Sequence, residues 1–178
     1  MAKKFYKSYE NYAGYVYILS NPLIQGVKIG CTTRTVAARL IEINQGPGVP
    51  AHYKEEYSVY TRRVEYLEKK MHDCLLNCRI KNSRELFDIP VDDARRILNE
   101  LFLQVENEID NDPKLKRIFD CINWLSKLLK KIDYHSDTLR YKKVKKDLAY
   151  LRHSGYNKET KYAKILEIEN QIKSLKGY

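Results

Sequence analysis

The chain has 178 residues and carries 33 Lys and Arg against 23 Asp and Glu, so its formal net charge is +10 and its pI is about 9.3. No apolar run approaches the ~20 residues that span a bilayer, and residues 1–12 hold three lysines but no apolar stretch. We therefore expect neither a membrane protein nor a secretory signal. The four cysteines lack paired zinc-ligand spacing, which favours reduced thiols and a cytoplasmic location over a structural zinc site.

The first part of the chain alternates between strand-like and helix-like segments. Residues 14–19 and 27–30 are rich in aromatic and β-branched side chains, and the turn-forming stretch 20–22 separates them. This pattern predicts a pair of strands. A helix is expected from about Thr35, and it should end before Gly46.

The next segments continue the alternation. The pattern predicts a strand over 53–60, a helix over 62–77, a short strand over 85–89 and a helix that begins near Pro90 and is apolar through Val105. The order ββαβαβα predicts an α+β domain over residues 12–105, with a small mixed sheet and flanking helices.

Alternation of side chains along the first two strands predicts two different faces. Tyr17 and Lys28 should emerge together on one face, because the other face takes the apolar residues Val16, Ile18, Val27 and Ile29. Gly30 would then let the chain turn closely toward the following helix.

A second unit is expected to begin after an acidic stretch at residues 106–113, which ends in Asn-Asp-Pro, a helix cap followed by proline. Apolar residues recur at intervals of three and four over 115–132 and 165–175, and a further helix is expected over 138–152. Residues 106–178 are therefore predicted to form an all-α unit. Its helices can pack on each other, dock on the first domain, form a homodimer or bind a partner protein.

Four polar residues of the first domain follow each other at set distances. Tyr17 ends a Tyr-Val-Tyr tripeptide, and Lys28 begins Lys-Ile-Gly 11 residues later. Arg39 follows after another 11 residues, and Glu85 after 46 more. In this order the chain resembles the GIY-YIG nuclease superfamily. It is most similar to the phage T5 orf172-like branch, also called the meiotically up-regulated gene 113 branch, whose second motif reads Lys-Ile-Gly. The resemblance covers roughly residues 12–105 and implies an endonuclease, a hydrolase of phosphodiester bonds.

Phosphodiester hydrolysis needs a nucleophile, positive charge beside the phosphoryl oxygens and stabilisation of the leaving oxygen. Glu85 is a hard oxygen ligand suited to one Mg²⁺ or Mn²⁺ ion, and Arg39 offers a planar fork of donors to the scissile phosphate. By resemblance to the family's first motif, Tyr17 accepts a proton from the attacking water. A free phenol has a pKa of about 10, so it needs a neighbouring cation, and Lys28 is expected to supply it.

Three more residues are candidates for lining this active site. Tyr15 and Gly30 belong to the two motifs. His72 shares one edge of a predicted helix with Glu65 and Glu68, a spacing that suits a metal or proton relay and equally a surface row of ion pairs. The resembling branch often has a His at this point.

Two residues are weaker candidates. His52 follows a loop rich in Gly and Pro and would contact the substrate. Asn99 is a positional candidate for the Asn that follows the Glu in some family members.

The positive charge is spread over both units, and such a surface attracts phosphate backbones without reading sequence. We therefore expect DNA as the partner, with RNA not excluded. The residues expected to bind the backbone project from one predicted helix, and they are Lys142, Lys143, Lys145 and Lys146. A solvated helix face explains them equally well. The alternative to an endonuclease is a catalytically inactive protein of the same fold that binds nucleic acid or acts in assembly.

Overall fold

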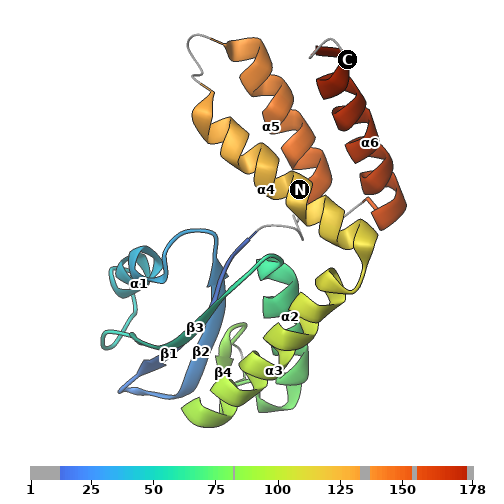
Figure 1. Cartoon of the computed structure of the whole chain (residues 1–178). Helices are drawn as coiled ribbons and strands as arrows, with labels where there is room; N and C mark the ends of the chain where they lie inside the picture. The colour runs from blue at the N-terminus through green and yellow to red at the C-terminus, as the bar shows by residue number, and fades with distance from the viewer. Residues whose placement is uncertain (1–12, 82, 133–136, 154–155, 176–178) are drawn as a thin grey trace, which may run out of the picture. The chain divides into compact units, whose positions relative to one another are not determined.

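The computed structural model describes residues 13–81, 83–132, 137–153 and 156–175 (Figure 1). They divide into two compact units, with the division after Asn107. The first unit contains a four-stranded sheet of β1 (Gly14–Asn21), β2 (Ile24–Thr32), β3 (Lys54–Thr61) and β4 (Leu86–Phe87), in the order β3-β1-β2-β4. Its helices are α1 (Val36–Asn44), α2 (Val64–Cys74), the short 3-10 helix η1 (Leu76–Cys78) and α3 (Val91–Asp110). The predicted α+β class and the order ββαβαβα are confirmed.

The sheet is antiparallel throughout, so the expectation of a mixed sheet is wrong. A tight turn joins β1 to β2, and β4 lies along β2 in the opposite direction, with Lys28 paired to Leu86. The turn lies at Pro22 and Leu23 instead of at residues 20–22. The reason is that the Asn21 side chain ends the strand, because its Oδ1 accepts a hydrogen bond from the Leu23 N–H at 2.9 Å.

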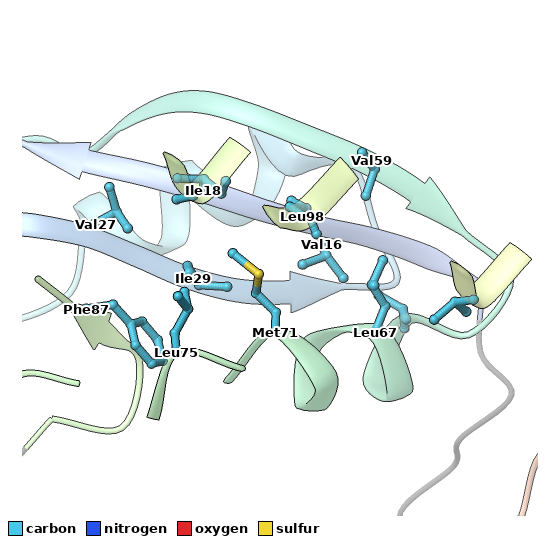
Figure 2. Close-up of a cluster of buried hydrophobic side chains, with 13 residues drawn as sticks. Val16, Ile18, Val27, Ile29, Val59, Leu67, Met71, Leu75, Phe87 and Leu98 are labelled. Carbon is cyan, nitrogen blue, oxygen red and sulfur yellow. The ribbon is translucent and has the colours of Figure 1, made fainter. Parts of the chain in front are cut away.

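The register of the first hairpin confirms the two predicted faces. Tyr17 pairs with Gly30 and Leu19 pairs with Lys28, and residues paired across antiparallel strands point to the same face. The opposite face carries the main core, whose strand residues are Val16, Ile18, Val27, Ile29, Val59 and Phe87. Figure 2 shows Val16 and Ile29 beside Met71 and Leu67 of α2, with Leu98 of α3 in the same cluster. Helices α2 and α3 therefore cover one face of the sheet.

A smaller core lies on the other face, under α1. It contains Tyr17, Leu19, Val36 and Tyr53, all buried. Helix α1 begins where the sequence predicts, because the Thr35 hydroxyl accepts a hydrogen bond from the Ala38 N–H at 3.3 Å. This face, on which α1 packs, carries the candidate site.

The second unit packs three helices on each other, which is one of the arrangements that the sequence leaves open. They are α4 (Pro113–Lys131), α5 (Thr138–Arg152) and α6 (Lys158–Leu175). Their shared core includes Ile118, Ile122, Leu148, Leu151 and Ile165. The predicted apolar positions Ile172 and Leu175 lie outside the side chains that the structure describes.

Helix α3 continues to Asp110, so the boundary expected after Val105 falls within a helix. Ile109, from the last turn of α3, belongs to the core of the second unit. Within the described ranges, none of the helices has the length and apolar character needed to cross a membrane.

Candidate active site

Tyr17 lies in the middle of the sheet and is almost completely buried, with 1% of its surface exposed. Its neighbour on β2 is Gly30, and a Cβ atom added there would lie 2.6 Å from the Tyr17 hydroxyl oxygen and 2.9 Å from the ring carbon that bears it. Gly30 therefore makes room for the phenol. The expectation that Gly30 turns the chain toward α1 is wrong, because β2 continues to Thr32.

Arg39, on α1, lies near enough to Tyr17 for each side chain to shift the pKa of the other. The guanidinium also donates to Glu42 at 3.2 Å, and Glu42 pairs with Arg34 at 2.6 Å. The interaction with Tyr17 is the largest effect on the Arg39 pKa, which is raised, so Arg39 remains a cation. Glu42 was not predicted as a site residue, although its position three residues after Arg39 on a helix is a usable signal.

Lys28 and Glu85 form an ion pair from two different segments. Lys28 lies in β2, and Glu85 directly precedes β4, where its carbonyl oxygen accepts a hydrogen bond from the Ile29 N–H at 2.9 Å. This backbone bond holds Glu85 beside β2. The Lys28 side chain is mostly buried, whereas 43% of the Glu85 side chain is exposed.

The four predicted residues are thus brought together as two pairs, but the pairing differs from the expectation. The cation that acts electrostatically on the Tyr17 phenol is Arg39, whereas Lys28 is bound to Glu85. The Tyr17 pKa is raised, chiefly by burial, and the nearby Glu85 charge adds to this. Arg39 opposes the rise without reversing it. The phenol is therefore protonated at neutral pH.

Tyr53 is a second phenol in this region, and its place in the site is not predicted from the sequence. It packs in the same small core as Tyr17, and its pKa is raised by burial and then by the charge of Glu85. Asn44 fixes it, because its side-chain oxygen accepts from the Tyr53 N–H at 2.7 Å and its amide donates to the Tyr53 carbonyl at 3.1 Å. No sequence pattern links Asn44 to Tyr53, since the contact joins the end of α1 to the residue before β3.

His72 lies on α2, which covers the opposite face of the sheet. Its Nε2 lies 3.1 Å from the Ile29 carbonyl oxygen, and its ring packs on Phe87 with 5.1 Å between centroids. Glu68, on the same helix edge, accepts a hydrogen bond from the Cys31 thiol at 3.1 Å. Burial, followed by the charge of Glu68, raises the Cys31 pKa, so this thiol is held protonated.

The other positional candidates divide between the two faces. Tyr15 lies on the Tyr17 face, where its ring meets Tyr60 with 5.1 Å between centroids in an edge-to-face arrangement. Asn99 lies on α3 and accepts a hydrogen bond from the Tyr57 hydroxyl at 2.7 Å. Because Tyr57 pairs with Ile18, this contact belongs to the opposite face of the sheet. His52 is exposed in the loop before β3.

The carboxylate of Glu85 has the chemistry of a ligand for one hard divalent ion. It is half-exposed and lies on the face of Tyr17 and Arg39. In the part of the chain that the structure describes, no three His, Cys, Asp or Glu side chains gather as a ligand set. Mg²⁺ commonly binds through one or two carboxylates and keeps several waters, so a single Glu fits it. The Lys28 ammonium would have to leave Glu85 before an ion could bind there.

The four predicted backbone-binding lysines project from α5. Lys142, Lys143, Lys145 and Lys146 are all exposed, while Val144 and Leu148 of the same helix are buried in the core of the second unit. Among the residues that the structure describes, none of the four forms an ion pair with a carboxylate. The helix therefore presents uncompensated positive charge to solvent.

Comparison with known proteins agrees with the resemblance at the level of the domain. Searches of curated proteins and of solved structures found no match. The sequence model of the T5orf172 domain matches residues 14–102, which cover the sheet, α1, α2 and most of α3. The matched range includes Tyr17, Lys28, Arg39 and Glu85. The chain therefore belongs to the T5orf172 domain family.

Proposed function

We propose that this protein is a metal-dependent endonuclease that hydrolyses phosphodiester bonds in DNA. The observation that carries the proposal is the meeting of two pairs, Tyr17 with Arg39 and Lys28 with Glu85, on one face of the sheet. Membership of the T5orf172 family is compatible with a nuclease-like or DNA-binding role. The position of this protein within the wider GIY-YIG superfamily is part of the same proposal.

Each side chain has a distinct task in this proposal. Arg39 binds the scissile phosphate, for which its planar guanidinium is suited, and it is the cation that opposes the rise in the Tyr17 pKa. Glu85 would hold Mg²⁺ or Mn²⁺, which supplies a Lewis acid for the phosphoryl oxygens. Lys28, once released from Glu85, adds positive charge beside the phosphate.

Tyr17 is the proposed general base. It would take a proton from the water that attacks phosphorus, as the bond between phosphorus and the leaving oxygen breaks. Because burial raises its pKa, only a small fraction is ionised at neutral pH, and the anionic form depends on the surrounding cations. The proposal therefore predicts slow cleavage near neutrality that accelerates in alkali.

A nicking assay on supercoiled plasmid with Mg²⁺ or Mn²⁺ tests the proposal. Glu85→Gln keeps the shape of the side chain but removes its charge, and Arg39→Ala removes the phosphate donor. We expect each to lower the rate by about 100-fold or more, the usual effect of deleting one preorganised charge stabiliser. Glu100→Gln is a matched control, because Glu100 is an exposed carboxylate paired with Arg96 on α3. Equal nicking by the wild type and Glu85→Gln would refute the assigned site.

A second candidate function rests on α5. Its four exposed lysines favour binding along a phosphate backbone, with or without catalysis by the first unit. If nicking is absent while salt-dependent DNA binding persists, the protein is a DNA-binding member of the family that has lost cleavage.

A further inference from the structure

An exposed aromatic side chain lies on the same face of the sheet as the candidate active site. Tyr60, on the edge strand β3, leaves 57% of its surface in solvent. It pairs with Tyr15 on β1, so both rings point to the face of Tyr17. The two rings meet edge to face at 66°.

The other aromatic residue of β3 is used differently. Tyr57 is half-buried against the main core, and its hydroxyl donates to Asn99 while its ring lies beside the Arg95 guanidinium. Among the residues that the structure describes, Tyr60 has a ring contact with Tyr15 alone. That contact covers only part of the Tyr60 ring. Its exposed surface is therefore available to a ligand.

The distance between Tyr60 and the catalytic residues suits a neighbouring nucleotide. Tyr15 lies two residues before Tyr17, and Tyr60 lies one strand further out. Strand spacings put the Tyr60 and Tyr17 backbones about 8 Å apart. A strand whose phosphate reaches Arg39 can therefore place an adjacent base over Tyr60.

We infer that Tyr60, supported by Tyr15, is a stacking platform for an unpaired base next to the scissile phosphate. Bases stack on protein rings without regard to sequence, since every base has a π-face. In an intact duplex the bases are stacked on each other, and moving one onto a protein ring costs free energy. The substrate class is therefore DNA with unpaired bases near the cut, either a single strand or a duplex with a bulged base.

Oligonucleotides that carry the fluorescent base 2-aminopurine test this inference. The inference rests on the proposed function only in placing the scissile phosphate at Arg39. Three probes are compared without divalent metal: a single strand, a duplex with 2-aminopurine in a one-base bulge, and the same duplex fully paired. Stacking on Tyr60 should quench the fluorescence of the first two. Tyr60→Leu should lose this quenching and bind the first two probes about 5- to 150-fold more weakly.

Two variants make the result specific. Tyr60→Phe keeps the ring and should retain both quenching and affinity, while Trp124→Leu removes an exposed aromatic residue of the second unit and should change neither. Equal quenching and affinity in the wild type and Tyr60→Leu would overturn the platform. So would tighter binding of the fully paired duplex. The quenching assay measures no cleavage. If the protein quenches the probes but, once Mn²⁺ is added, cleaves neither the plasmid nor the single-stranded and bulged probes, the platform stands and the nuclease is rejected.

Discussion

Replacement of Gly30 by alanine tests the idea that this glycine exists to make room for the Tyr17 phenol. The added Cβ would lie 2.6 Å from the hydroxyl oxygen, and ordinary van der Waals contact begins at 3.4 Å, so the ring must shift by about 0.8 Å. Tyr17 has 1% of its surface exposed, so no open space is available to receive it.

The size of the effect follows from two opposing contributions to the free energy of unfolding. Alanine is favoured over glycine in a strand by about 0.5–1 kcal/mol. Overpacking a filled core typically costs about 1–3 kcal/mol. The overlap is close and involves a buried ring, so overpacking dominates, and Gly30→Ala should lose about 1 kcal/mol. The effect on cleavage should be larger, since a misplacement of about 1 Å can cost about 100-fold in rate.

Urea denaturation and plasmid nicking measure the two effects, and a double-mutant cycle with Tyr17→Phe isolates the contact. Phenylalanine lacks the oxygen atom that lies closest to the added Cβ, so Gly30→Ala should be less destabilising in that background by at least about 0.5 kcal/mol. If Gly30→Ala is equally costly in both backgrounds, or stabilises the protein, the steric argument is wrong.

Three other predictions follow from the site and from α5. Lys28→Met should tighten Mn²⁺ binding, measured by calorimetry, by about 1.4- to 5-fold or more, since a partly exposed ion pair with Glu85 must no longer be broken. Lys54→Met, which removes an exposed lysine elsewhere, should leave the Mn²⁺ affinity unchanged. If Tyr17 is the base, log kcat should rise with pH at a slope near 1 to at least pH ~10, because the raised pKa of the phenol delays its ionisation. A plateau in log kcat below pH ~8 would exclude Tyr17 as the base. Replacement of three exposed lysines of α5 by Glu should weaken DNA binding. It should also lower the slope of log affinity against log salt concentration by roughly one unit for each phosphate contact that is lost. An unaltered slope would assign α5 to packing alone. The three lysines are Lys142, Lys143 and Lys146.

The sequence was sufficient for those parts of the fold that depend on local pattern. Alternation placed Tyr17 and Lys28 on one face, and the cap at Thr35 fixed the start of α1. The sequence also predicted α5 over residues 138–152, which the structure confirms. These features depend on neighbouring residues and on the periods of strands and helices.

The partners within the site could not be predicted in the same way. Lys28 had been expected to assist Tyr17, but the backbone bond from Ile29 to Glu85 brings a carboxylate within its reach. Arg39 acts on the phenol instead. Which carboxylate pairs with Lys28 depends on how two segments 57 residues apart meet in the fold. The spacing of residues along the chain does not contain that information.

The two hydrogen bonds between the Asn44 side chain and the main chain of Tyr53, one donated and one accepted by Asn44, close the loop between α1 and β3 at its base. Within the loop, Val49 packs against the small core and the Ala51 carbonyl accepts a hydrogen bond from the Asn21 amide, so the remaining loop residues do not have to hold the helix and the strand in position. Lengthening a flexible loop costs little, about 0.6 kcal/mol for each doubling of its length. This loop is consequently a place where the domain can accept inserted sequence while Arg39 and Tyr17 keep their geometry.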